Sequence, residues 1–261
     1  MKRLILFTLL AMFVATSCCD NANNKAPKRQ GWDYEYDMTL YGNVESVAIV
    51  SYAVKELDGE VVKDSMVNKI VYKFNKCGHV AEREGYNNEN VLVWNALYKY
   101  DEQDYLTELV GCTNDGMVVN KGFFAHDEQG NLTEAVWRNG ADLLVGKYLY
   151  KYDERGNLVE AAWLNGDDSL NMKYVATYDE NDNKVELVGY IGDGSVVIRS
   201  LFKYDEKGNM VEETKYNAEG LLVATVVCKN DEQGNRVEEV EYDGEAASPK
   251  SLVEYEIVYR N

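Results

Sequence analysis

Carboxylates recur along the chain at a fixed spacing, and they are the side chains most able to do chemistry. A glutamate stands every 26 residues at seven successive places: Glu82, Glu108, Glu134, Glu160, Glu186, Glu212 and Glu238. Two neighbouring carboxylates can act as a general acid and a general base. A catalytic pair is local to one cleft, whereas a residue present at every place of an array is architectural. We therefore predict a structural role for this glutamate column and no catalytic residue.

An aspartate begins a turn seven residues before most of these glutamates. The turn reads D-E-x-G-N or a close variant, and its first residues are Asp101, Asp127, Asp153, Asp179, Asp205 and Asp231. The carboxylate accepts backbone N–H groups, and a glycine three residues later suits a type I turn with a G1 bulge. The ligand spacing of an EF-hand loop and any C-x-x-C pair are both lacking. We therefore predict a structural role for these aspartates, no metal and no cofactor.

Two tryptophans form the candidate ligand site. Trp137 and Trp163 each stand ten residues after a turn aspartate, in adjacent segments. Two stacked indoles on one face would make a platform for sugars, because aromatic rings pack against the apolar faces of pyranoses. Local packing at a bend is the alternative. The only histidines, His79 and His126, stand in or beside turns and form no Ser-His-Asp pattern, so we predict that the protein is not an enzyme.

All these residues belong to a tandem repeat of 26 residues. An aromatic-polar-aromatic strand such as Tyr98 to Tyr100 precedes each turn, and a second strand follows it. A second turn joins each hairpin to the next, so one antiparallel meander is expected from about Tyr41. Both faces of the strands are partly apolar, and a flat single sheet would leave these apolar side chains exposed to water. We predict an all-β fold in which the hairpins form an elongated, curved β-solenoid or superhelical sheet.

The expected register places the residue before the aspartate opposite the fifth residue after it. The third residue before the aspartate is then expected opposite the glutamate. In this register an aromatic ring at the third position before each aspartate lies between successive glutamates. The residue eight places after the aspartate is expected on the opposite face from the aromatic pairs.

The core Y-x-Y-D-x-x-G-N-L, as written from Tyr150 to Leu158, resembles the YD repeats of the RHS type in bacterial surface and secreted proteins. The resemblance covers Ile70 to about Tyr242. It implies a repeat fold but no activity, because the enzymatic parts of that family lie outside the repeats. Proteins of that family form large coiled shells around another segment. This chain has too few repeats for us to expect that it encloses anything. With the export signal described next, the pattern resembles lipoproteins of Bacteroidetes.

The first residues have the pattern of an export signal. Lys2 and Arg3 precede an apolar run from Leu4 to Val14, which is too short to span about 30 Å of hydrocarbon. The small residues before Cys18 resemble a bacterial lipobox, which implies that Cys18 is lipidated.

The expected organisation therefore has five parts. Residues 1–17 form the signal peptide and 18–35 form the lipidated cysteine with a flexible tether. Residues 36–69 form an N-terminal capping repeat with a long loop, 70–244 the repeat array and 245–261 a capping strand. We expect this last strand to lack a partner at one edge.

The leading hypothesis is a cell-envelope lipoprotein, held by its lipid on the periplasmic or the surface leaflet of the outer membrane. It would bind or scaffold protein partners through sheet edges and curved faces. The alternative is polysaccharide binding at Trp137 and Trp163. The net charge of −18 argues against nucleic acid as a partner. A transmembrane β-barrel is disfavoured, because the glutamates alternate with apolar residues in mid-strand and both faces are mixed.

Two short motifs bear on modification. Asp64-Ser65-Met66 and Asp168-Ser169-Leu170 resemble the O-glycosylation pattern of Bacteroidetes proteins. Both motifs are expected in loops, which makes Ser65 and Ser169 candidate glycosylation sites.

Overall fold

The computed structural model describes residues 40–260. Over this range sixteen antiparallel strands follow one another along the chain. They are β1 (Val44–Leu57), β2 (Glu60–Phe74), β3 (Val80–Tyr86), β4 (Leu92–Tyr100), β5 (Leu106–Thr113), β6 (Val118–His126), β7 (Leu132–Asn139), β8 (Leu144–Tyr152), β9 (Leu158–Asn165), β10 (Leu170–Tyr178), β11 (Lys184–Ile191), β12 (Val196–Tyr204), β13 (Met210–Asn217), β14 (Leu222–Asn230), β15 (Arg236–Asp243) and β16 (Pro249–Tyr259).

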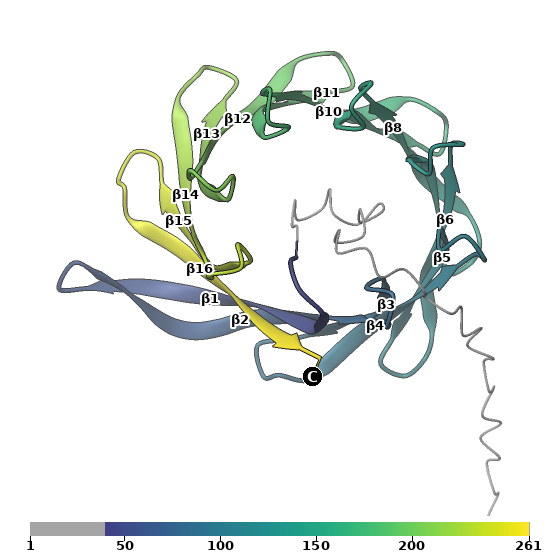
Figure 1. Ribbon diagram of the computed structural model, residues 1–261, viewed down its shortest axis with the longest axis horizontal. Helices are drawn as coiled ribbons and strands as arrows, with labels where there is room; N and C mark the ends of the chain where they lie inside the picture. Colours follow the sequence, from purple (N-terminus) through teal and green to yellow (C-terminus); the bar gives the residue numbers. More distant parts are fainter. Residues whose placement is uncertain (1–39, 261) are drawn as a thin grey trace, which may run out of the picture.

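The sheet closes on itself into a barrel (Figure 1). Each strand pairs with the next one, and β1 pairs with β16 from Val44–Tyr259 to Ala53–Ser251. The predicted all-β meander is present, but the predicted open solenoid is wrong, and so is the unpaired edge expected for β16. Twisted sheets rarely exceed about ten strands without curling, and closure gives both outer strands a partner.

The signal peptide of residues 1–17, Cys18 and the tether to residue 35 lie outside the described residues. Within residues 40–260, no helix has the length and apolar character needed to cross a membrane.

The turns have the geometry that the sequence predicts. In the turn at Asp127, the carboxylate Oδ1 accepts the backbone N–H of Gln129 at 3.0 Å and of Asn131 at 2.8 Å. Gly130 has a φ of 83°, which favours glycine because it has no Cβ. Asp104 takes the glycine place in its own turn with a φ of 65°, a conformation that aspartate tolerates better than most residues.

A bulge shifts the register beyond the turn by one residue. Tyr100 lies opposite Leu106, as predicted, but Glu108 lies opposite Lys99, whereas the aromatic Tyr98 lies opposite Leu109. The predicted pairing of the aromatic residue with the glutamate is therefore wrong, and so is the face predicted for the eighth residue after the aspartate. One extra residue in the second strand produces the shift.

The bulge sorts the side chains into two distinct faces. One face carries the aromatic pairs and the leucines beside them, and it includes the most buried residues: Tyr72, Val80, Leu106, Leu132 and Ala135. It is the inner face of the barrel, toward which the D-E-x-G-N turns curl (Figure 1). The apolar core of this protein is thus the lining of its own barrel.

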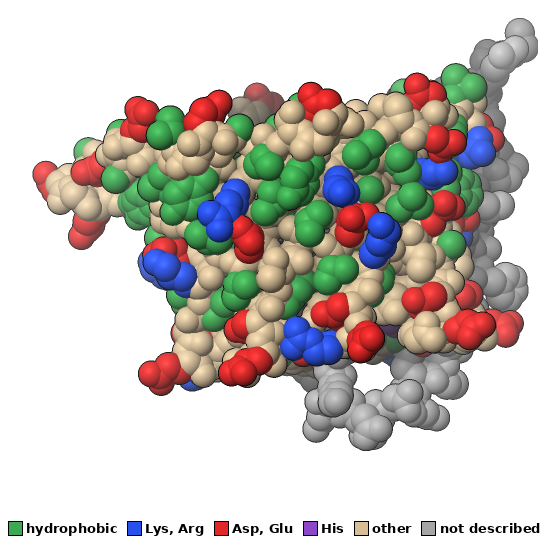
Figure 2. Space-filling model, turned by 90° about the horizontal axis from the view of Figure 1, so that it is seen from above, with side chains coloured by type: hydrophobic (Ala, Val, Ile, Leu, Met, Phe, Trp, Pro, Cys, Tyr) green, Lys and Arg blue, Asp and Glu red, His purple; other side chains and the backbone are tan. Residues whose placement is uncertain are grey.

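On the outer face, most glutamates of the column form ion pairs with a lysine of the neighbouring strand, and Glu186 pairs with Arg199. Figure 2 shows this wall, where basic groups lie beside acidic ones among hydrophobic side chains. The pairs whose two residues lie directly opposite each other are Lys73–Glu82, Lys99–Glu108, Lys151–Glu160, Lys203–Glu212 and Lys229–Glu238.

Strands β1 and β2 extend beyond the barrel as a two-stranded hairpin (Figure 1). Their mutual pairing continues to Leu57–Glu60, while the pairing of β1 with β16 ends at Ala53. The pairing of β2 with β3 begins only at Lys69. The long loop predicted in this region is therefore a strand extension, which we call the β1–β2 arm (residues 54–67).

Candidate functional site

Aromatic side chains line the inner face from β4 to β10, on every strand of this stretch except β5. We call this surface the aromatic wall. It consists of Trp94, Tyr98, Phe124, Trp137, Tyr148, Tyr150, Trp163 and Tyr174. Both candidate tryptophans belong to it, so a ligand that reaches them does so from inside the barrel.

The indoles lie over glycines of the neighbouring strand. A Cβ added to Gly146 would come within 2.7 Å of the Trp163 ring, and one added to Gly122 would come within 3.3 Å of the Trp137 ring. Trp163 also packs on Tyr148, with 4.6 Å between ring centroids. A missing side chain leaves space for a large ring to lie against the sheet. These rings therefore pack locally and still present flat apolar surface to the interior.

The two indoles do not stack on each other, so the predicted stacked pair is wrong. Trp137 is on β7 and Trp163 on β9, and both strands pair with β8 between them. Two strand spacings separate the rings, roughly 10 Å. Gly146 stands opposite Trp137 on that middle strand. The arrangement is a row of separate aromatic surfaces.

One buried donor on the aromatic wall lacks an acceptor among the described residues. The indole N–H of Trp137 is buried without a hydrogen-bond partner, while its ring packs edge to face on Phe124. Leaving a buried donor unpaired costs about 1–3 kcal/mol. A ligand oxygen that accepted this hydrogen bond would recover part of that free energy.

Strands β13 and β15 carry charges on the inner face. Lys215 lies 3.4 Å from Glu241 and 3.7 Å from Glu213, and Arg236 pairs with Glu239. The corresponding residues of earlier repeats are apolar, aromatic or glycine for most of the array. Our sequence reasoning missed this sector, although the change of residue type at fixed repeat positions was the signal for it.

In most repeats a tyrosine before the turn connects successive hairpins. Tyr178 Oη donates to the carbonyl oxygen of Leu158 at 2.9 Å, and Tyr204 Oη donates to that of Lys184 at 2.9 Å. His126 occupies the same place in its own repeat and stacks on Tyr105. Burial lowers the pKa of His126, partly offset by the nearby carboxylates of Asp101 and Asp127.

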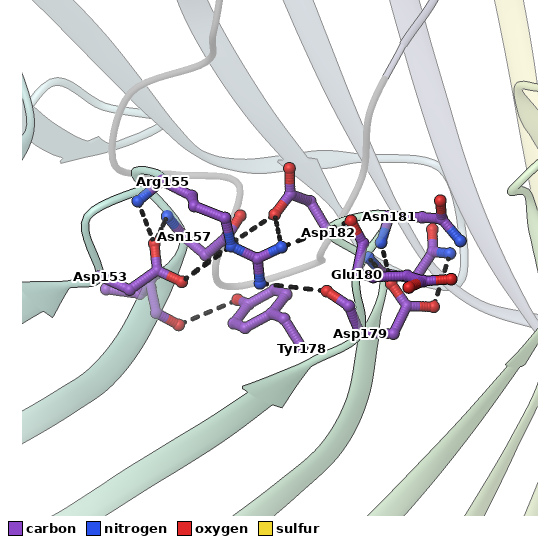
Figure 3. A network of polar contacts seen from close by, with 10 residues as sticks. Asp153, Arg155, Asn157, Tyr178, Asp179, Glu180, Asn181 and Asp182 are labelled. Atoms are coloured by element: carbon purple, nitrogen blue, oxygen red, sulfur yellow. Dashed lines mark hydrogen bonds and ion pairs between the residues drawn. The ribbon is translucent and has the colours of Figure 1, made fainter.

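The turns at this end of the barrel also contact one another (Figure 3). Arg155 Nη1 lies 2.9 Å from the Asp182 carboxylate, and its Nη2 donates to the carbonyl oxygen of Asp179. Asn157 Nδ2 donates to the same Asp182 carboxylate at 2.8 Å. Side chains of the turn at Asp153 thus contact the turn at Asp179. We call the end of the barrel formed by the D-E-x-G-N turns the rim.

A cavity of about 280 Å³ opens among the last turns of this rim. Lys184, Tyr204, Asn209, Asn230 and Arg236 contribute to its lining. These residues come from β11 to β15 and from the turns between them.

The two candidate glycosylation serines lie outside the aromatic wall. Ser65 is exposed on the β1–β2 arm, so its predicted loop is a strand. Ser169 lies in the turn before β10, where its hydroxyl donates to Asp167 Oδ1 at 2.6 Å. Over residues 40–260, no three His, Cys, Asp or Glu residues are grouped so that they could hold a metal ion.

These features define a class of protein by its fold: a closed antiparallel β-barrel of sixteen strands with an aromatic inner wall. A porin-like protein from Bacteroides uniformis has a similar fold, with a TM-score of 0.54 and 11% sequence identity. The alignment covers 82% of this chain and 96% of that chain. At this identity the likeness concerns the fold alone.

A Tc holotoxin pore from Photorhabdus luminescens aligns with a TM-score of 0.34 and 12% identity. That alignment covers 72% of this chain but 12% of the toxin chain, and its score is too low to support an argument. No protein-family model matches the chain, and no curated protein is similar to it in sequence.

Proposed function

We propose that the chain is a non-enzymatic lipoprotein of the cell envelope whose barrel binds a glycan along the aromatic wall. The observation that carries this proposal is the position of Trp137 and Trp163 on the inner face, each over a glycine of β6 or β8. Flat aromatic rings pack against the apolar faces of sugars, and the unpaired N–H of Trp137 is a donor for a sugar hydroxyl.

The envelope location rests on the export signal of residues 1–17 and on Cys18 as the lipidated residue. We infer that the hairpins are repeats of the YD type, because six turns retain the D-E-x-G-N pattern or a close variant.

The outer wall supports a barrel that stands in water beside the membrane. Lys147 lies 2.7 Å from Asp168 on a strand whose neighbouring outward residues, Val145 and Leu149, are apolar, and Lys173 lies 3.7 Å from Glu160. A lysine on the lipid face costs about 2–4 kcal/mol at the bilayer midplane. We expect the chain without residues 1–18 to stay monodisperse in buffer without detergent. Aggregation that detergent reverses would favour a membrane-spanning barrel.

A second candidate is the scaffold for protein partners. Closure of the barrel removes the free outer strands on which that hypothesis first rested, because β1 and β16 pair with each other. The β1–β2 arm offers an alternative, since the backbone of Val61 to Val67 pairs with β1 on one side and precedes the pairing with β3. An extended peptide can add to such a strand. Loss of a partner protein on deletion of residues 54–67 would favour the scaffold.

The direct test is calorimetric titration of the mature chain with soluble amylose, xylan, mannan and polygalacturonate. We expect at least one of these polysaccharides to bind. Trp163→Ala is expected to weaken that binding about fivefold, because one lost stacking contact is worth about 1 kcal/mol. Trp137→Ala is expected to weaken it roughly tenfold, because the hydrogen bond from its indole N–H is lost as well.

Adjacent phenylalanines provide a matched control. Phe124 packs on Trp137 on the inner face, whereas Phe123 is 38% exposed on the outer face. Phe124→Ala should weaken glycan binding and Phe123→Ala should leave it unchanged. Equal losses for both variants, or no binding by any of the four polysaccharides, would contradict the proposal.

A further inference from the structure

The repeat itself shows which residues the fold does not require. Five residues after the first residue of each turn (Asn75 in the first repeat and the aspartate in the others), most repeats carry an apolar side chain on the inner face: Val80, Leu106, Leu132, Leu158 and Met210. The other two repeats carry Lys184 and Arg236 at this place. A hairpin of this type folds with leucine there, so the fold does not require a cation at this place, although Lys184 Nζ lies 5.2 Å from the centre of the Phe202 ring.

The two cations meet at one cavity. Both Lys184 and Arg236 contribute to the lining of the 280 Å³ cavity at the rim. Asn230, which replaces the aromatic residue found before the turn in most repeats, lines it as well. Three departures from the repeat pattern therefore share one space in a chain whose net charge is −18.

Arg236 has hydrogen-bonding capacity that its neighbours do not use. Its side chain is 12% exposed, its Nη1 pairs with Glu239, and the guanidinium also donates a hydrogen bond to the Tyr255 hydroxyl. Its Nη2 faces the sulfur of Met210 at 3.6 Å, which is a weak acceptor, and its Nε is buried without a hydrogen-bond partner. A guanidinium prefers charged oxygens, which it binds in a fork of two donors.

The remaining lining includes one carboxylate, that of Asp182, which Arg155 already pairs with, and groups that fit a sugar ring. Tyr204 contributes an aromatic ring and Asn209 an amide, groups that contact the apolar face and the hydroxyls of a sugar. The volume lies just below the roughly 300 Å³ at which pockets for small molecules begin. One sugar residue fits this size better than an oligosaccharide.

We propose that this cavity binds an acidic sugar residue, one that carries a carboxylate or a sulfate group, with Arg236 and Lys184 as the recognising cations. The proposal rests on the glycan-binding function above and specifies its ligand as an acidic glycan. The aromatic wall would hold neutral stretches of the chain, and the rim cavity would select for the charged residue.

The test uses the mature chain and two variants that restore the repeat pattern. Lys184→Leu introduces the residue found at Leu132 and Leu158. The double variant Arg236→Leu with Glu239→Ala reproduces the Leu–Ala combination of the repeats that contain Ala135 or Ala161, and it strands no buried carboxylate. Circular dichroism checks that both variants keep the fold.

Binding of glucuronic acid, glucose 6-sulfate and glucose is measured by nuclear magnetic resonance titration. We expect at least one acidic sugar to bind tenfold more tightly than glucose, and this preference to disappear in both variants. The acidic sugar that binds identifies the group as carboxylate or sulfate. The control Lys151→Leu removes a cation from the outer wall and should keep the preference.

Two outcomes would overturn the proposal: no preference for either acidic sugar, or an equal loss in Lys151→Leu. The result is separable from that for the aromatic wall. If neutral polysaccharides bind through Trp137 and Trp163 but acidity has no effect, the cavity proposal fails alone. If acidic sugars bind through Arg236 but Trp137→Ala has no effect on polysaccharide binding, the function assigned to the wall fails and the cavity stands.

Discussion

At the scale of single residues, the array supplies its own comparisons, because the same place is occupied by different side chains in different repeats. The place before the turn holds Tyr100, Tyr178 and Tyr204, whose hydroxyls donate to a carbonyl of the preceding hairpin, and it holds His126 once. A neutral imidazole there stacks on Tyr105, but its Nε2 is buried without a partner.

We predict that His126→Tyr stabilises the protein. The new hydroxyl is placed to donate to the carbonyl oxygen of Leu106, as Tyr178 does to that of Leu158. One added hydrogen bond of this kind is worth about 1 kcal/mol in the free energy of unfolding, measured by chemical denaturation at pH 7. Tyr178→Phe is the reciprocal variant and should lose a similar amount. A destabilised His126→Tyr protein would contradict the role given to this place.

The same substitution should change how stability depends on pH. The folded state lowers the pKa of His126 through burial, so the unfolded chain takes up the proton first as pH falls. Stability from this group is complete above the unfolded pKa of about 6.5 and declines as pH falls from there toward the folded pKa. The advantage of His126→Tyr should therefore be larger at pH 5 than at pH 8. Parallel curves for the two proteins would show that His126 titrates normally.

At the scale of strands and turns, the repeat period and the D-E-x-G-N turns were readable from the sequence, because turn chemistry is local. The register was not, since it depends on a bulge of one residue. That bulge moves Glu108 from the aromatic Tyr98 to Lys99 and decides which residues face inward. The sequence pointed to Trp137 and Trp163 as candidate ligand-binding residues. That β8 separates their strands could not be predicted, because it follows from the strand pairing.

The outer ion pairs predict a specific pattern of double-mutant effects. Lys203 Nζ lies 2.5 Å from Glu212 Oε1, and the two residues are directly opposite each other. Lys203→Glu should lower the denaturation midpoint slightly, because like charges then oppose one another across two strands in a solvent-exposed pair. Adding Glu212→Lys should restore most of that stability. Strictly additive losses in the denaturation midpoints would mean that the pair does not interact.

At the scale of the whole molecule, closure was beyond the reach of the repeat pattern. The sequence of each hairpin specifies its own turn and its pairing with the next hairpin. Whether the sheet closes depends on the curvature summed over sixteen strands. The joined strands are about 200 residues apart in sequence, and both of them are atypical members of the array. The charged residues on the inner face of β13 and β15 were missed for a related reason, because the sheet has an inner face only once it is closed.

Residues near the seam hold the two ends of the barrel together. Asn235 is fully buried and its Nδ2 donates to the carbonyl oxygen of Tyr41 at 3.0 Å and to Tyr259 Oη at 2.8 Å. Arg260 donates to the carbonyl oxygen of Val44 at 2.9 Å. These contacts join the first, last and second-last strands at one rim. The distinction between an aromatic wall inside and ion pairs outside depends on this seam.

The most direct measurement is therefore a cross-link across the seam. Ala48 lies opposite Glu256 in a regular stretch of the β1–β16 pairing, where two cysteines can form a disulfide. We predict that Ala48→Cys with Glu256→Cys forms an intramolecular bond in the purified monomer, identified by mass spectrometry of the linked peptides. The control Ala48→Cys with Glu254→Cys, offset by two residues, should link poorly. Absence of the predicted link, or a link only between molecules, would contradict a closed barrel and the inner binding surface with it.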